Sequence, residues 1–407
     1  MGATVSSPQV PLASPPPALH APSARNSLSV FFLSGMLMSF LGAILPAWGY
    51  HLRDDFREVG HYFLALAAGL LLSIPLGRAL MRRRGVRITV MSGCFAAAAA
   101  FISLALAGPP VDWWWRAAGV AFLGICAGTL NNAAFQSIST AYDMDPASTV
   151  NLAGVLFGIG CLLMALLVSS TFYVYTVGSM LLLVAAIPGF AGGLYRKATF
   201  GQPVVHAERP VREIWAEVRS PGAVLFTLLL FFQLGNEWSI AGWLTIYLVQ
   251  TVGVSPDRAI LMLSAYWLAL LVGRGAAQAL IPRVGHGKLL TGSSLAALFG
   301  CLILAGTNNL FGAWTGLLLI GGGFAMIYPL VVERIGHRFP DYHPGFFNGL
   351  LSLGIGGGLL APWLLGYLAN LWGIRTVMLI PAIGTVIVFV LIVLIWVEAR
   401  LVGSRPA

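Results

Sequence analysis

Charged residues are scarce in this sequence, and their scarcity excludes most classes of protein. Lys, Arg, Asp and Glu make up 9% of the 407 residues, and 58% of the residues are hydrophobic. Soluble proteins carry about 25% charged residues. With a mean hydropathy of +0.85, the chain is expected to be an integral membrane protein whose surroundings are the lipid bilayer. The formal net charge of +9 would suggest a nucleic-acid partner only in a soluble protein, so none is expected.

Cysteine is also rare, and the patterns of catalytic sites are missing. The four cysteines all fall in apolar runs, as small core residues do, and are not expected to form disulfides or bind metal. The apolar runs contain no paired nucleophile and base, no phosphate-binding loop and no cluster of His, Cys and Asp. We therefore expect no enzyme activity, no cofactor and no metal site. A membrane-embedded sensor, which binds a molecule but does not move it across the membrane, stays an alternative.

Long apolar runs are what the sequence does contain. Runs of about 20 residues, the length that crosses a bilayer, occur near 28–50, 59–80, 88–108, 114–139, 149–169, 173–195, 222–249, 259–281, 289–306, 309–331, 345–368 and 374–398. The longest polar stretch, 196–221, divides these twelve runs six and six. We predict an all-α membrane protein with two six-helix bundles at 27–195 and 222–400, joined by a cytoplasmic linker. Segment 1–26, rich in Pro, Ala and Ser, is expected to be disordered, and 401–407 forms a tail.

The basic residues predict how the chain is oriented in the membrane. With the N-terminus in the cytoplasm, sixteen of the 23 Lys and Arg residues fall in cytoplasmic segments and five in outer segments. Cytoplasmic loops carry an excess of Lys and Arg. Both termini are therefore expected in the cytoplasm, and the protein is expected in a bacterial inner membrane.

An internal repeat relates the two sets of six runs. The tripeptide "LGR" ending at Arg78 matches "VGR" ending at Arg274, and "GIG" from Gly158 matches "GIG" from Gly354, each at a shift of 196 residues. These pairs lie in equivalent runs, so the halves are expected to be parallel repeats related by an axis along the membrane normal. Transporters built this way bind their solute near the midplane, between the halves.

Equivalent basic segments follow the second and eighth runs. They are "GRALMRRRGVR" from Gly77 and "GRGAAQALIPRVGHGK" from Gly273. We expect a gating or interface role for five of their residues, Gly77, Arg78, Arg84, Arg274 and Arg283. The alternative is that these arginines only fix the topology. Arg274 lies inside its run, where it either pairs with a carboxylate in one state or extends to the inner surface.

A single acidic residue lies deep inside an apolar run. Glu237 is about twelve residues from each end of the seventh run, and a charge at that depth costs about 2.5–3.5 kcal/mol. Such residues usually face the bundle interior or a wet cavity. Gln233 and Asn236 lie within one turn of it, so the three are expected to form one polar stripe. Glu237 is predicted to bind solute and to carry a coupling proton, or else to be a structural, hydrogen-bonded glutamate.

Other polar and aromatic residues inside the runs are candidates for solute binding. In the fourth run Thr129, Asn132, Gln136 and Thr140 share a helical face, with Asn131 beside them. Amides of this kind can also join two helices without touching a ligand. Aromatic side chains inside other runs could stack on a sugar, although many Trp in membrane proteins lie at the lipid interface. The aromatic candidates are Tyr266, Trp267, Tyr328 and Trp363, with Trp238 beside Glu237.

Over residues 28–400 the chain resembles the major facilitator superfamily. Within it, "LGNEWSIAGWLTIYL" resembles the seventh helix of the fucose–galactose–glucose:proton symporter group, and "YWLALLVGR" resembles its eighth. "GFAMIYP", "GGGLLAPWLLGYLAN" and "NLAGVLFGIG" resemble its tenth, eleventh and fifth helices. The resemblance implies a sugar or polyol that is moved by alternating access, and it transfers Glu237 and Arg274 as matched positions.

Two departures from the group leave the coupling and the direction of transport open. Its proton-coupled members generally also have carboxylates in the first half, whereas the position equivalent to Glu237 is Leu41. The fifth run lacks the Gly-Pro step usual in drug antiporters, with Ala165 near the place of the proline. We predict a monomeric secondary transporter of a small sugar-like solute. The alternatives are proton-driven efflux of amphipathic compounds and a facilitative uniporter.

Overall fold

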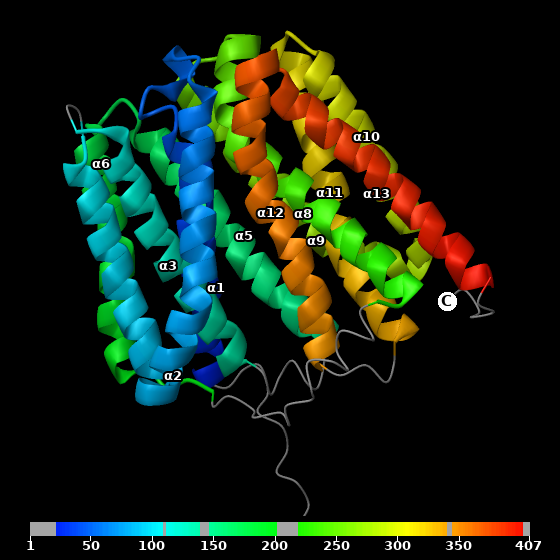
Figure 1. Cartoon of the computed structure of the whole chain (residues 1–407), viewed down its shortest axis with the longest axis horizontal. Helices are drawn as coiled ribbons and strands as arrows, with labels where there is room; N and C mark the ends of the chain where they lie inside the picture. The colour runs from blue at the N-terminus through cyan, green and yellow to red at the C-terminus, as the bar shows by residue number, and fades with distance from the viewer. Residues whose placement is uncertain (1–21, 109–110, 139–145, 202–218, 340–343, 402–407) are drawn as a thin grey trace, which may run out of the picture.

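A computed structural model of the chain describes residues 22–108, 111–138, 146–201, 219–339 and 344–401. The described part is helical throughout, and its long helices run side by side (Figure 1). The first group is α1 (Pro22–Ile44), α2 (Phe56–Leu106), α3 (Trp113–Ser137), α5 (Pro146–Thr171) and α6 (Val177–Leu194). The second is α8 (Pro221–Tyr247), α9 (Pro256–Val284), α10 (His286–Gly306), α11 (Leu310–Arg338), α12 (Pro344–Trp372) and α13 (Thr376–Leu401). Short helical turns, η1 (Tyr50–Leu52), η2 (Tyr195–Lys197) and η3 (Leu248–Val252), lie between them.

Helix α2 contains two membrane spans. It has 51 residues, which as one straight helix would measure about 75 Å, more than twice the thickness of the hydrocarbon core. Gly85 breaks it with a φ of 76° and a ψ of 171°, a backbone conformation that favours glycine. The chain turns back there, and the expected runs 59–80 and 88–108 lie on either side. Eleven helices of the described part are long and apolar enough to span. With α2 counted twice, the twelve predicted spans are confirmed.

The expected ends of the chain differ in detail from the structure. Helix α1 begins at Pro22, so residues 22–26 of the segment predicted to be disordered are helical. Residues 1–21, most of the predicted linker (202–218) and most of the C-terminal tail (402–407) lie outside the described residues. The division into bundles at 27–195 and 222–400 stays a prediction.

The helices pack mainly with others of their own half. In the first half α2 packs on α3 and α6, and α1 on α5; in the second, α8 packs on α12 and α13, and α10 on α11. Contacts between the halves run through α5 with α9, α2 with α12, and α1 with α8. The start of α1 and the end of α13 lie at the lower side of Figure 1. We call this side the terminus end and the other side the opposite end.

At the opposite end the two halves are in direct contact. Thr245 Oγ1 donates to the carbonyl oxygen of Gly42 at 2.8 Å, and Ser169 Oγ donates to that of Asp257 at 2.8 Å. His61 Nε2 and the Tyr367 hydroxyl lie 2.9 Å apart. These bonds link α1 with α8, α5 with α9, and α2 with α12. The structure is therefore closed between the halves at the opposite end.

A buried cluster stabilises the first half at that end. The hydroxyls of Tyr50 and Tyr62 both donate to the Glu58 carboxylate, and the two hydroxyl oxygens lie 2.8 Å apart. Arg116 lies over the ring of Trp48 at 5.6 Å. The cluster ties the connection after α1 to the start of α2.

Replacing Tyr50 by Phe tests this cluster. The change removes one hydrogen bond to a carboxylate while the ring keeps its packing, which is expected to lower the free energy of unfolding by about 1.5–3 kcal/mol. Thermal unfolding of the purified protein in detergent measures it. Tyr175→Phe is the matched control, because Tyr175 is 50% exposed. An equal effect of the two substitutions would contradict the role given to Tyr50.

Candidate functional site

A cavity of about 460 Å³ lies between the halves. Helices α1, α3 and α5 line it from the first half, and α8, α9, α11 and α12 from the second. Its lining includes Asn151 and Gly154 near the start of α5 and Val332 and Glu333 near the end of α11. All of these lie toward the terminus end, so the cavity extends toward that end. Its volume is typical of a small-molecule site.

Glu237 and Arg274 are the charged pair of this cavity. Glu237 lies in the middle of α8 and is 5% exposed. Its Oε1 atom is 3.8 Å from Nη2 of Arg274 on α9, while its Oε2 atom is buried and has no hydrogen-bond partner among the described residues. The pairing expected in one state is therefore the arrangement found. At 3.8 Å the two groups attract each other but leave hydrogen-bonding capacity unused.

Arg274 also connects the two halves. Its Nη1 atom donates to the carbonyl oxygen of Gly154 on α5 at 2.7 Å, and its Nε atom is buried with no hydrogen-bond partner in the part of the chain that the structure describes. A β-carbon at Gly154 would lie 2.7 Å from Nη1, so the glycine leaves room for the guanidinium. One side chain thus contacts a carboxylate of the second half and a backbone oxygen of the first.

Aromatic rings form the apolar part of the wall. Trp238, next to Glu237, packs edge-on against Phe157 of the first half and against Trp267 of α9, each with ring centroids 6.1 Å apart. The Trp267 ring nitrogen Nε1 is buried, and no described residue accepts a hydrogen bond from it. Tyr328 lines the cavity from α11. The wall therefore offers ring faces and one unused N–H donor beside the charged pair.

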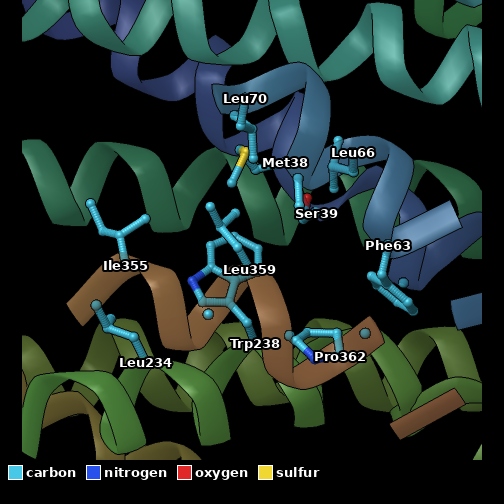
Figure 2. Close-up of a pocket in the computed structure, with 15 residues that line it drawn as sticks. Met38, Ser39, Phe63, Leu66, Leu70, Leu234, Trp238, Ile355, Leu359 and Pro362 are labelled. Carbon is cyan, nitrogen blue, oxygen red and sulfur yellow. The ribbon is translucent and has the colours of Figure 1, made fainter. Parts of the chain in front are cut away.

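Trp238 separates this cavity from a smaller, apolar one. Figure 2 shows the second pocket, of about 100 Å³, with Trp238 at its centre and Met38 and Ser39 reaching in from the first half. Trp238, Leu234 and Ile355 line both spaces. Among the described residues that line the small pocket, Ser39 and the Trp238 indole carry the polar side-chain atoms. The polar groups are therefore concentrated in the larger cavity.

The three residues of the polar stripe expected on the seventh span do not all face the same cavity. Asn236 Nδ2 donates to the Thr385 hydroxyl of α13 at 3.4 Å, on the side of α8 away from Arg274. Gln233 is fully buried, its amide has no hydrogen-bond partner among the described residues, and it does not line the cavity. Tyr266 supports the site from behind, because its hydroxyl donates to the backbone oxygen of Glu237 at 3.3 Å.

The amides of the fourth span are also divided. Asn131 lines the cavity, and its Oδ1 atom accepts from Ser34 at 3.4 Å. Asn132 is half-buried and Gln136 is exposed, and neither lines the cavity. Trp363 packs edge-on against Tyr367, with ring centroids 5.7 Å apart, and its ring nitrogen has no hydrogen-bond partner within the described ranges. It lines neither space between the halves.

The residues expected to gate lie apart from each other. Gly77 is buried against Thr129 of α3, with 3.8 Å between a β-carbon built at Gly77 and the nearest Thr129 atoms. Arg78, Arg84 and Arg283 are exposed toward the terminus end. Of the five, Arg274 is the one in the cavity wall.

Two wall residues carry polar groups that the sequence did not assign to a solute site. Asn151 of α5 lines the cavity. Glu333 lies at the mouth with its side chain 32% exposed, and its Oε2 atom is 2.8 Å from Nε2 of His286. The sequence did not indicate Glu333 as a cavity residue, because the tenth span was expected to end near residue 331, whereas α11 continues to Arg338. An acidic residue near a helix end usually indicates a solvated face.

The sequence and the fold both match known proteins. The family model of the Major Facilitator Superfamily matches residues 27–359 and 226–406. A crystal structure of FucP in the outward conformation has a TM-score of 0.61 at 18% identity, covering 91% of this chain and 98% of that one. One of the E. coli fucose:proton symporter FucP has a TM-score of 0.60 at 17% identity, with the same coverage. At such identities the likeness shows the fold.

Relatives of similar sequence are also transporters by name. A glucose/galactose transporter of Brucella abortus biovar 1 is 27% identical over 162 residues, 39% of each chain. An uncharacterized MFS-type transporter of Yersinia pestis is 25% identical over 151 residues, 37% of this chain and 39% of that one. The chain thus spans about two-fifths of the length of these two relatives. The uncharacterized transporter y4wD of Sinorhizobium fredii is 22% identical over 370 residues, 90% of this chain and 96% of the relative. The helical architecture and the family match together show that this chain belongs to the Major Facilitator Superfamily.

Proposed function

We propose that the protein moves a small, sugar-like solute across a bacterial inner membrane by alternating access, and that Glu237 couples this movement to a proton. The observation that carries the proposal is the carboxylate of Glu237 in the wall of the cavity between the halves, with one oxygen unpartnered and Arg274 at 3.8 Å. The Brucella relative is named as a glucose/galactose transporter and FucP as a fucose:proton symporter, which supports a sugar-like solute.

The unused hydrogen-bonding atoms suit a polyhydroxylated molecule. Glu237 Oε2 can accept, and Arg274 Nε and Trp267 Nε1 can donate. A buried polar atom without a partner costs about 1–3 kcal/mol, and sugar hydroxyls, which both donate and accept, would satisfy all three. The faces of Trp238 and Trp267 would contact the apolar faces of the ring. Asn131 and Tyr328 complete the proposed set.

The position of the cavity fits one state of a transport cycle. The halves are hydrogen-bonded to each other at the opposite end, and the cavity extends toward the terminus end. The distribution of Lys and Arg predicts that the terminus end is cytoplasmic. On this reading the structure is inward-facing. Arg274 contacts both halves, so movement of one half against the other would change its contacts with Gly154 and Glu237 together.

The proportions of the two spaces favour a polar solute over an amphipathic one. Efflux of amphipathic compounds calls for a broad apolar cavity. The apolar pocket beside Trp238 measures about 100 Å³, whereas the cavity with the charged pair measures about 460 Å³. Of these two spaces between the halves, the larger one is next to the polar groups.

Ligand-induced thermal stabilisation tests the solute class. We expect one or more monosaccharides from a panel of sugars, nucleosides, peptides and organic acids to raise the melting temperature. At a ligand concentration of 100 times Kd, binding adds about 2.7 kcal/mol to the free energy of unfolding. Trp267→Phe removes the unpartnered N–H from the cavity and should abolish most of the shift. Trp363→Phe makes the same change outside both spaces and should leave the shift intact. Stabilisation by non-sugar compounds alone would refute the sugar proposal.

A further inference from the structure

A second large cavity, of about 660 Å³, lies inside the second half. Helices α8, α10, α11 and α13 form its walls, and it shares no lining residue with the cavity of Glu237. Its lining comes from the start of α8, the start of α10 and the ends of α11 and α13, so it lies toward the terminus end. Most of the lining is apolar, as in Phe226, Leu290, Ile392 and Trp396.

Two cations line this apolar cavity, and none of its described lining residues is acidic. Lys288 comes from α10 and Arg334 from α11. Arg334 is half-buried, and no carboxylate of the described residues is recorded within 4.0 Å of its guanidinium. One turn later, Arg338 does have such a partner, Glu398 at 3.0 Å. A half-buried cation without a counter-ion next to an apolar space is costly, which indicates an anionic ligand.

The start of α10 adds positive potential on the same wall. This helix of 21 residues begins at His286, and its N-cap residue, Gly285, has no side chain that could accept a hydrogen bond. Its first-turn N–H groups therefore have no side-chain acceptor from the cap, and the helix dipole places partial positive charge there. Gly287 and Lys288, in that first turn, line the cavity.

One side of the cavity faces the surroundings of the bundle. Val393 and Trp396 of α13 line it and are 43% and 42% exposed. The same helix exposes Val390 and Val397, as a lipid-facing helix does. Arg400 lies over the Trp396 ring at 3.5 Å. The cavity is thus open to apolar surroundings near the basic end of the protein.

We propose that this cavity binds an anionic phospholipid from the adjoining leaflet. The phosphate would lie between Lys288, Arg334 and the start of α10, and an acyl chain would follow the apolar walls. Basic pockets between transmembrane helices recognise lipid head groups in this way. Each Lys or Arg near an anionic leaflet contributes about 1 kcal/mol, which is about fivefold in affinity. This inference does not depend on which solute the central cavity takes.

Binding of defined lipids to the full-length protein in detergent tests the proposal. By native mass spectrometry we expect tighter binding of dioleoylphosphatidylglycerol than of dioleoylphosphatidylcholine. The double substitution Lys288→Gln with Arg334→Gln should weaken phosphatidylglycerol binding by about fivefold for each charge removed. Arg82→Gln with Arg83→Gln removes two exposed arginines that line none of the three cavities and should change little. An equal loss in both double variants would overturn the proposal.

A third variant tests the cavity without changing its charge. Gly292 lines it, and a β-carbon built there meets no atom within 4 Å, so Gly292→Phe can fold while filling the space. We expect it to weaken phosphatidylglycerol binding as strongly as the charge removal does. Unchanged binding in this variant would refute the site. Glycerol 3-phosphate, the head group without chains, should not compete; competition at similar concentration would identify a soluble phosphate as the ligand and overturn the lipid proposal.

Discussion

Glu237→Gln is expected to abolish uphill accumulation of solute while leaving exchange of solute across the membrane intact. Glutamine has nearly the same shape and still accepts and donates hydrogen bonds, but it cannot take up and release a proton. Solute that needs only to be bound and carried across would still move. In proteoliposomes with an imposed pH gradient, accumulation should fall to the background of empty vesicles. Counterflow of labelled solute against unlabelled solute should continue.

The same substitution at the mouth of the cavity is the matched control. Glu333 also lines the cavity, but its side chain is 32% exposed and it lies close to His286. Glu333→Gln is expected to keep gradient-driven accumulation. If accumulation and exchange both survive in Glu237→Gln, the glutamate is structural and coupling does not depend on it. Loss of accumulation in both variants would show that the effect is not specific to the deep carboxylate.

The spans could be predicted from sequence because the bilayer fixes their length. Runs of about 20 apolar residues have one stable arrangement in lipid, a helix that satisfies its own backbone. The two basic segments after the second and eighth runs could also be recognised in the sequence. Each contains a glycine with a positive φ, Gly85 at 76° and Gly285 at 82°. Composition gave no warning that α1 begins as early as Pro22, because Pro is well accommodated in the first turn of a helix.

The depth of Glu237 could be predicted, but the direction of its neighbours could not. Consecutive helical residues are rotated by about 100°, so Asn236 contacts Thr385 of α13 while Glu237 faces Arg274. A spacing of three or four residues indicates that residues share a helix face, but it does not indicate which helix covers that face. Gln233, four residues before Glu237, is fully buried and does not line the cavity. Arg274 donates to the backbone carbonyl of Gly154. Every residue has such a carbonyl, so the sequence does not indicate which one binds Arg274.

Gly366→Leu is expected to hold the two halves apart at the opposite end and to stop transport. Gly366 of α12 packs directly on α2: a β-carbon built on it lies 2.7 Å from both Gly60 Cα and the Phe56 carbonyl oxygen. These are backbone atoms, so the helices themselves must separate. Alternating access requires this end to close. Spin labels at Leu52 and Trp372, which are 80% and 69% exposed, should report a longer distance than in the otherwise unchanged protein.

Gly356→Leu provides the comparison within the same helix. A β-carbon at Gly356 meets a single atom, Phe231 Cε2, at 3.9 Å, which is ordinary contact, so this variant should close and transport. Gly366→Leu should lose transport to background yet keep stabilisation by solute, because the change is remote from Glu237 and Trp267. That combination separates a blocked gate from a misfolded protein. If Gly366→Leu transports normally with an unchanged label distance, closure by glycine contact between α2 and α12 is not part of the cycle.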